Sequence, residues 1–332
     1  MAQMKYFYEL TISSSPHAHS PVTTQTIMRD VLIALVPALL GSIYFFGFRA
    51  LLVTLVSAAA CVFFEWGFCK VRKLHCKTYD LSAVVTGVLL AFVCPVTIPY
   101  WTIILGDFFA IVLVKMLFGG LGTNIVNPAL AGRAFLFSWP VLMSNWVKVG
   151  FDNAAGLLST ADAVTAATPM SAMHQGALPE ESILDMFLGN IGGCIGETSA
   201  LLLIIGFIYL LYRKVITARI PLAYIGTVAI LAFLFPQGND RIAWMAAQVF
   251  GGGLMLGAIF MATDYVTSPL TKLGQIVYGI GCGVITILIR YFGGYSEGVT
   301  YAILCMNACA VLLDKIGRPV KFGAPKKEAA KK

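Results

Sequence analysis

Long apolar stretches with almost no charge are the feature that most restricts how this chain can fold. Residues 103–118, 199–212, 222–235 and 277–291 are stretches of this kind. A helix that crosses the roughly 30 Å hydrocarbon core of a bilayer requires such a stretch, because no water is available there for polar groups. Strands of a membrane barrel alternate apolar and polar residues and would interrupt it. We therefore predict an all-α polytopic membrane protein.

The composition of the whole chain agrees with this class. Of 332 residues, 58% are hydrophobic and 12% are charged, and the mean hydropathy is +0.83, far from soluble domains. The first thirty residues lack an apolar core followed by a small-residue cleavage site, so we expect no removable signal peptide. The 8 cysteines form no CxxC pair, and we predict neither a metal site nor a disulfide framework.

Ten helical spans fit the apolar pattern: 30–47, 50–69, 81–98, 101–117, 127–146, 192–212, 219–235, 242–262, 274–291 and 299–315. Five spans precede a long loop and five follow it, so the two halves run in opposite senses. We expect two inverted five-helix repeats with broken or re-entrant helices. The predicted divisions are an N-terminal tail (1–29), a first repeat (30–146), a loop (147–190), a second repeat (191–315) and a basic C-terminal tail (316–332).

The basic residues predict the orientation. With the N-terminus in the cytoplasm, Arg49, Lys148, Arg241 and Arg290 lie outside and Arg133 lies within a span, which leaves the other 18 of 23 inside. The positive-inside rule favours this arrangement, with both tails cytoplasmic and the loop 147–190 extracytoplasmic. The net charge of +7 is thus explained by the orientation of the chain in the membrane. We expect the lipid bilayer, and no nucleic acid, as its partner.

Four predicted spans are interrupted by glycine, proline, asparagine or threonine. The interruptions are "CPVTIP" (94–99), "FGGLGTNIVNPALAGR" (118–133), "GNIGGCIGETS" (189–199) and "MATDYVTSPLT" (261–271). Broken backbone at membrane depth is tolerated only where it is buried in protein or lines a cavity. Close helix packing through small residues is one explanation, and a central site for a cofactor, ion or solute is the other.

The predicted outer loop contains the sequence "DAVTAATP" (162–169). Taken alone, Thr168 followed by Pro169 predicts the N-cap of a short helix, with Met170, Met173 and Ala177 along one face. A capping threonine at a helix start is also accessible to other molecules. His174 follows closely, and we interpret it as a solvated histidine.

Three segments together resemble a family of membrane proteins that includes the D subunit of the Rnf complex and the B subunit of the sodium-pumping NADH:quinone oxidoreductase. "DAVTAATP" resembles the family's flavinylation motif, "FGGLGTNIVNPALAGRAFL" (118–136) resembles its glycine and asparagine segment, and "ATDYVTSP" (262–269) resembles a third segment. The number of spans, the cytoplasmic termini and the outer loop match as well, so the resemblance covers nearly the whole chain.

The resemblance implies that FMN is attached covalently to Thr168 by a phosphoester. A flavin transferase outside the cytoplasm would use FAD and release AMP. Of the motif residues, Asp162 and Thr165 would be recognised by the transferase or orient the loop, and Ala167 would leave space around the hydroxyl. The family usually has glycine where this chain has Ala166. If that glycine provides a positive φ, attachment is slow or absent here; if it only has to be small, alanine suffices. We favour the second explanation, because the flanking motif residues all match.

The family's B subunit also holds riboflavin without a covalent link, which implies a possible second flavin or ion site here. Asn124, Asn127, Arg133, Asp264 and Thr267 are its candidate residues. The alternative is that the asparagines cap re-entrant helix ends and Asp264 caps a turn. For Arg133 we expect an acid, a broken-helix carbonyl or a flavin as its partner.

The resemblance predicts an electron-transfer subunit of an ion-translocating oxidoreductase in a bacterial or archaeal cytoplasmic membrane. Electrons would pass between ferredoxin and NAD⁺, coupled to export of Na⁺ or H⁺, and partners would include iron–sulfur subunits and a second flavinylated subunit. The chain itself lacks a Rossmann fingerprint and a cluster-binding cysteine set. Two alternatives stay open: an inverted-repeat channel or transporter for a small solute, and a scaffold subunit without flavin.

Overall fold

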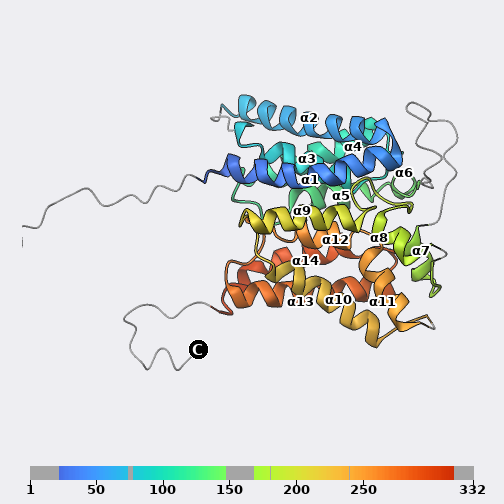
Figure 1. Ribbon diagram of the computed structural model, residues 1–332. Coiled ribbons are helices and arrows are strands. Elements are labelled where there is room, and N and C mark those ends of the chain that lie inside the picture. The colour runs from blue at the N-terminus through green and yellow to red at the C-terminus, as the bar shows by residue number, and fades with distance from the viewer. Residues whose placement is uncertain (1–21, 74–77, 147–167, 180, 239, 318–332) are drawn as a thin grey trace, which may run out of the picture.

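The fold is a layered bundle of helices. The computed structural model describes residues 22–73, 78–146, 168–179, 181–238 and 240–317, and these residues form helices and turns without strands. Figure 1 shows the long helices side by side. We call the end of the bundle where the first helix begins and the last helix ends the terminal face. The opposite end, which carries the short helices around residue 170, is the loop face.

The predicted first half and loop contain the following elements: α1 (Thr24–Phe46), α2 (Phe48–Val71), η1 (Thr78–Asp80), α3 (Ser82–Phe92), α4 (Tyr100–Phe108), the π-helix η2 (Phe109–Met116), α5 (Pro128–Leu136), α6 (Pro140–Met143), α7 (Pro169–His174) and α8 (Ile183–Leu188). The second half contains α9 (Ala200–Tyr212), α10 (Arg219–Leu234), α11 (Arg241–Phe250), α12 (Leu254–Leu256), the π-helix η4 (Gly257–Met261), α13 (Lys272–Phe292) and α14 (Val299–Leu313).

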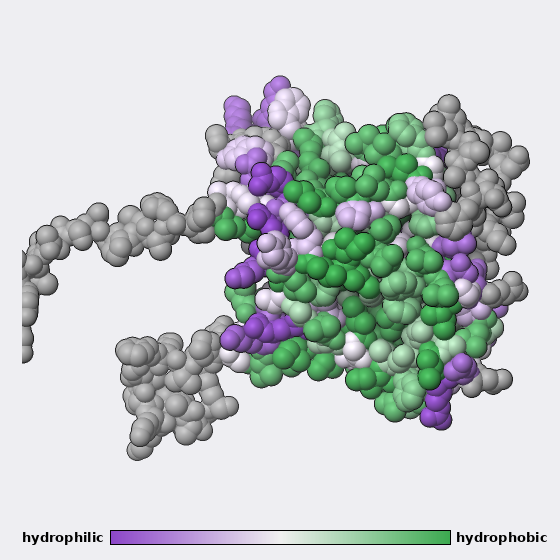
Figure 2. Space-filling view, in the orientation of Figure 1, coloured by the Kyte–Doolittle hydropathy of each residue, from purple (hydrophilic) through white to green (hydrophobic). Residues whose placement is uncertain are grey.

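The helix lengths are those of a multi-pass membrane protein. In the described ranges, α1, α2 and α13 are long and apolar enough to cross a bilayer. A fourth candidate is formed by two consecutive helical segments, 241–250 and 254–261, with a bend of 58° between them. The apolar helices α3, α9, α10 and α14 are shorter. Figure 2 shows a hydrophobic band with hydrophilic residues gathered toward the two faces. The count of ten spans and the inverted repeats stay predictions.

The predicted interruptions are present, and two of them meet in the middle of the molecule. The Ile195 N–H donates to the Cys94 carbonyl at 3.0 Å, and the Gly196 N–H donates to the Phe92 carbonyl at 2.8 Å. A Cβ on Gly196 would lie 2.3 Å from the Phe92 side chain, so only glycine permits this approach. The broken segments of the two halves therefore satisfy each other's backbone, as membrane depth requires.

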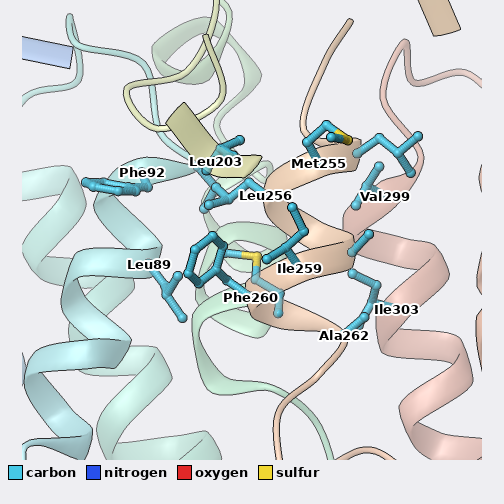
Figure 3. Packing of buried hydrophobic residues seen from close by; sticks show 14 of the residues in the cluster. Leu89, Phe92, Leu203, Met255, Leu256, Ile259, Phe260, Ala262, Val299 and Ile303 are labelled. Carbon is cyan, nitrogen blue, oxygen red and sulfur yellow. The ribbon is translucent and has the colours of Figure 1, made fainter. Parts of the chain in front are cut away.

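A layer of large apolar side chains occupies the centre. Figure 3 shows Leu89 and Phe92 of α3 close to Leu203 of α9, Leu256 of α12 and Phe260 of η4. All five are buried. The layer lies between two pockets, one at each face.

Candidate functional site

Thr168 lies where the sequence predicts a helix N-cap. Its backbone is extended, its Oγ1 accepts a hydrogen bond from the Ser171 N–H at 3.3 Å, and Pro169 begins α7. Met170 and Met173 are buried as expected. The expectation that Ala177 shares their face is wrong, because α7 ends at His174 and Ala177 is exposed beyond it. His174 is exposed, but its Nδ1 lies 2.8 Å from the Arg290 carbonyl, so it is packed as well as solvated.

The half-buried Thr168 side chain lines a small cavity, which we call the loop-face pocket. Cys194, Glu197 and Glu297 line the same pocket, whose volume is about 40 Å³. One water molecule needs about 10–15 Å³ of cavity volume, so the pocket has room for a few water molecules and is too small for a flavin ring.

A cluster of charged side chains forms the floor of the loop-face pocket. Arg133 donates from Nη1 to Glu197 Oε1 at 3.1 Å and from Nη2 to Glu297 Oε2, and it lies over the Phe137 ring. The Gly253 N–H donates to the second oxygen of Glu297. Arg133 and Glu197 are buried, and together with Glu297 they form an ion-paired cluster within the membrane protein.

The ligand atoms of Cys194, Glu197 and Glu297 lie within 4.8 Å of one another, close enough to hold a metal ion. However, the guanidinium of Arg133 already lies between the two carboxylates. A cation there would displace Arg133, so we interpret the cluster as an ion-pair network. Burial acts to raise the pKa of Glu297, but Arg133 and the Gly253 N–H outweigh it and hold the pKa below its ordinary value.

The terminal face contains a second and larger hollow, the terminal pocket, of about 80 Å³. Asn124, Asn127 and Asp264 line it, as three of the candidate residues should, together with Lys115 and Ser82. Thr267 does not line it and instead donates its hydroxyl to Asp264 Oδ2 at 3.1 Å. Four of the five residues expected to form one site therefore lie together.

The expected grouping of Arg133 with these residues is wrong. Its side chain reaches the acidic residues under the loop-face pocket instead. The expectation that Arg133 pairs with an acid is confirmed. The cause is the direction of α5: Asn127 begins the helix at the terminal pocket, and Arg133 lies more than a turn further toward the loop face.

The side chains around the terminal pocket differ in how fully they are paired. Asn127 caps α5 by accepting from the Ala129 N–H at 3.0 Å, and its amide donates to the Met261 carbonyl at 3.2 Å. Asp264 accepts from Thr267 and, weakly, from the Val266 N–H. Burial raises the pKa of Asp264, and these hydrogen bonds only reduce that effect. Asn124 is buried, and its Oδ1 has no hydrogen-bond partner.

These contacts test the alternative explanation that the asparagines cap helix ends and Asp264 caps a turn. Asn127 is a helix cap and Asp264 does brace a turn, as that explanation predicts. Asn124 caps nothing, because its carbonyl oxygen is unpartnered. The motif residues Asp162, Thr165, Ala166 and Ala167 lie outside the described residues.

Several charged residues outside the predicted site residues are also buried or half-buried. Glu197 and Glu297 accompany Arg133, and Glu65 pairs with Lys115 at 3.1 Å. Asp107 is buried on α4. An ionisable residue inside an apolar stretch is itself a functional signal, and this signal marks Asp107 and Lys115 in the run 103–118.

Comparison with known proteins places the chain in a family. The profile of the NQR2, RnfD, RnfE family matches residues 11–323. The chain belongs to this family. It is 46% identical over 323 residues to the D subunit of the Na(+)-translocating ferredoxin:NAD(+) oxidoreductase complex of Acetobacterium woodii, covering 96% of each chain.

Other relatives in the family carry related names. The D subunit of the proton-translocating ferredoxin:NAD(+) oxidoreductase complex of Clostridium ljungdahlii is 44% identical, with 94% of this chain and 96% of the relative covered. The D subunit of the ion-translocating oxidoreductase complex of Actinobacillus succinogenes is 34% identical, with 93% and 96% covered. The family resemblance inferred from three short segments is thus confirmed over the whole chain.

Proposed function

We propose that this chain is the flavin-carrying membrane subunit of an Rnf-type complex, which transfers electrons between ferredoxin and NAD⁺ and translocates Na⁺ or H⁺. The names of the relatives support the complex. The observation that carries the flavin assignment is the position of Thr168, which ends the motif and caps α7 at the rim of the loop-face pocket. The subunit contributes electron transfer and is not a complete enzyme by itself.

The local geometry suits attachment of FMN to Thr168. Thr168 Oγ1 would form a bond to the phosphorus atom in the FMN half of FAD. The pyrophosphate bond between FMN and AMP would break, AMP would leave, and the hydroxyl proton would pass to the transferase or solvent. In the cap, Oγ1 accepts from the Ser171 N–H, so its own proton remains available for transfer to a base. When bound, FMN supplies one- and two-electron redox chemistry. The residues around Thr168 position the attachment point.

A second flavin, riboflavin held without a covalent link, fits the terminal pocket by the chemistry of its donors and acceptors. The unpartnered Oδ1 of Asn124 is a buried acceptor, and a flavin ring offers an N–H donor beside two carbonyl acceptors. The pocket of about 80 Å³ is smaller than a flavin ring needs, so the lining side chains must separate to admit it. Tyr265 and Leu121, both exposed, are the residues with room to move.

The orientation follows from the positive-inside rule. The terminal face would lie in the cytoplasm, where electrons from ferredoxin enter, and the loop face would lie outside, where a flavin transferase reaches Thr168. The partners are then the other membrane and peripheral subunits of the complex, including iron–sulfur subunits and a second flavinylated subunit. A flavin at each face would leave the apolar layer of Figure 3 between them.

Flavin fluorescence of the denatured chain on a gel tests the attachment, using protein from a host that makes the flavin transferase. We expect fluorescence from the native chain and from Thr168→Ser, which keeps the hydroxyl, and none from Thr168→Ala. Ser171→Ala is the control: it removes the hydroxyl that donates to the Thr168 carbonyl at 2.7 Å but keeps the backbone N–H that contacts Oγ1, so it should leave fluorescence intact. Equal fluorescence in Thr168→Ala would place the flavin elsewhere.

The effect of the unusual alanine is measured in the same assay. If residue 166 only has to be small, the Ala166→Gly chain should acquire flavin at the same rate as the native chain. A native chain that is not labelled, beside an Ala166→Gly chain that is, would mean that the motif needs a positive φ at this position.

A small-solute channel or transporter is the second candidate. It is favoured by one observation, the presence of a pocket at each face with buried apolar side chains between them. A channel does not need the threonine motif. Absence of flavin in every variant, with the transferase active on another target, would favour this function.

A further inference from the structure

A group of polar side chains lies deep in the first half, between α2 and α4. Ser57 and Cys61 are one turn apart on α2, and both face Asp107 of α4. All three side chains are inaccessible to solvent. Asp107 lies near the middle of the continuous helix formed by α4 and η2, residues 100–116, so it is far from both faces.

Among the residues that the structure describes, Asp107 has no cationic partner. None of the four ion pairs among the described residues includes it. Its Oδ1 contacts Ser57 and Cys61, and its Oδ2 is buried without any hydrogen-bond partner. An isolated carboxylate in this environment is strongly disfavoured relative to the neutral acid.

The contacts around Ser57 fit a protonated Asp107. Its Oγ lies 2.8 Å from the Gly87 carbonyl and 2.7 Å from Asp107 Oδ1. A serine hydroxyl has one proton and donates it to one acceptor, and a carbonyl has none to offer. Both contacts are hydrogen bonds if Asp107 is a carboxylic acid that donates to Ser57, while Ser57 donates to Gly87.

A chain of hydrogen-bonded polar groups begins at Glu65, one turn from Cys61 on α2, and leads to the terminal pocket. Lys115 Nζ donates to Glu65 Oε1 at 3.1 Å and to Ser82 Oγ at 2.7 Å, and the Ser82 hydroxyl donates to Asp80 at 2.6 Å. Lys115 and Ser82 line the terminal pocket. Glu65 lies one turn beyond Cys61 on α2, and its Oε2 is buried without a partner.

The other titratable groups near Asp107 come from every element packed against α4. They are Cys61 and Glu65 on α2, Lys115 on η2, Cys94 after α3, and Arg133 on α5. Lys115 and Arg133 are each engaged by glutamates. Neither neutralises Asp107, and the two cysteines are buried thiols.

We propose that Asp107 is a proton-binding site in the membrane interior that exchanges its proton with the terminal pocket through Glu65, Lys115 and Ser82. The step is reversible protonation, in which a carboxylate takes one proton from the terminal face and no electrons move. This site lies within the first half of the chain, away from Thr168, and does not depend on either flavin.

Labelling with dicyclohexylcarbodiimide tests the site in the purified whole complex, because this reagent reacts with protonated carboxyls in apolar surroundings. We expect an adduct on the peptide that contains Asp107, found by peptide mass, which diminishes as the pH is raised. Asp107→Asn should lose the adduct and Asp107→Glu should retain it. Asp30 is the matched control, because it is also buried but paired with Arg213 at 3.0 Å and should stay unlabelled.

Further variants make the test decisive. Lys115→Met leaves Glu65 unpaired, so Glu65 should become labelled, which shows that the reagent reaches this depth. Labelling of Glu65 there, with Asp107 unlabelled in the native complex at every pH, would overturn the proposal. Protection of Asp107 by Na⁺ at fixed pH would also overturn it, since Na⁺ and not a proton would then be the occupant. In the Thr168→Ala variant, Asp107 should be labelled by the carbodiimide as in the native complex. The test of Asp107 is therefore independent of the flavin assignment.

The exchange route has its own measurement. Infrared spectroscopy follows the replacement of the acid proton by deuterium after transfer of the complex to heavy water. Exchange at Asp107 should slow in Lys115→Met and in Ser82→Ala, while the carbodiimide adduct remains. Unchanged exchange in both variants would contradict the route through Lys115 and Ser82.

Discussion

The buried carboxylates under the loop face and those behind the terminal pocket are paired in different ways, although the loop face also contains buried atoms without a partner, Arg133 Nε and Asn190 Oδ1. Under the loop face, Arg133 is shared by Glu197 and Glu297, and the free oxygen of Glu297 accepts from the Gly253 N–H. Around and behind the terminal pocket, Asn124, Glu65 and Asp107 each keep a buried oxygen without a partner. A carboxylate paired with a cation stabilises a structure, whereas a buried oxygen without a partner costs stability unless a ligand or a proton completes it.

The largest effect is expected from removing the shared cation of the loop face. Arg133→Met leaves two buried carboxylates unpaired and should destabilise the protein by about 3–5 kcal/mol. Arg133→Lys should be intermediate, because an ammonium group cannot bridge two carboxylates as a guanidinium does. Thermal unfolding of the purified complex measures both. Equal stability of Arg133→Met and the native protein would mean that the cluster is not structural.

The contact between the two broken segments should be the next most sensitive. Gly196→Ala places a Cβ against the Phe92 side chain and should cost about 1–3 kcal/mol by overpacking. Gly226→Ala is the control, since a Cβ there meets no atom within 4 Å. If both variants melt at the same temperature, the close approach of the halves is not required.

Glu297 and Asp264 should change the stability of the protein with pH in opposite directions. The pKa of Glu297 is held down in the folded protein, so its stabilising contribution is present above its unfolded pKa and is lost as the pH falls. The pKa of Asp264 is raised, so its contribution is present at low pH and is lost as the pH rises through the folded value. Stability should be measured against pH. Glu297→Gln should reduce the loss of stability as the pH falls, and Asp264→Asn should reduce the loss of stability as the pH rises. Unchanged profiles in both variants would contradict this assignment.

The cap at Thr168 should contribute modestly to stability. Thr168→Ala removes the oxygen that accepts from the Ser171 N–H, at a cost of about 1 kcal/mol, while Thr168→Ser keeps it. Both proteins should still insert and assemble, so loss of flavin in Thr168→Ala can be separated from loss of folding. Failure of Thr168→Ala to accumulate would show a larger structural role.

The smallest effect on stability is expected at Asn124. Because its Oδ1 has no partner, Asn124→Leu should leave stability unchanged or raise it slightly. The same variant should weaken retention of non-covalent flavin, measured as flavin released after detergent extraction. Asn127→Ala should instead destabilise the protein, because Asn127 caps α5. A clear loss of stability in Asn124→Leu would remove the basis for a ligand at this pocket.

Local sequence signals predict local structure well in this chain. Thr168 followed by Pro169 marks a helix start, and the glycines of "FGGLGTN" mark a break in which Gly119, Gly120 and Gly122 adopt positive φ. The apolar run 277–291 lies in α13, which is long enough to cross a bilayer, whereas the runs 199–212 and 222–235 lie in shorter helices. Each of these depends on neighbours in the chain. The family is also recognisable, because its motifs are contiguous segments.

Pairings across the fold cannot be read in the same way. Arg133 is 64 residues from Glu197 and 164 from Glu297, and only the folded arrangement of α5 with the break before α9 joins them. Asp107 and Ser57 come from different helices in the same half. Membership in a site depends on which face of a helix a residue occupies and how far along it lies, which is why proximity in sequence wrongly groups Arg133 with Asn127.

The mass of the peptide that contains Thr168 tests the central claim most directly. The chain would be purified within its complex from a host with an active flavin transferase, digested and fragmented to locate any adduct. We predict one FMN joined through a phosphoester to Thr168. An unmodified peptide, with the transferase shown to modify another protein in the same cells, would contradict the account.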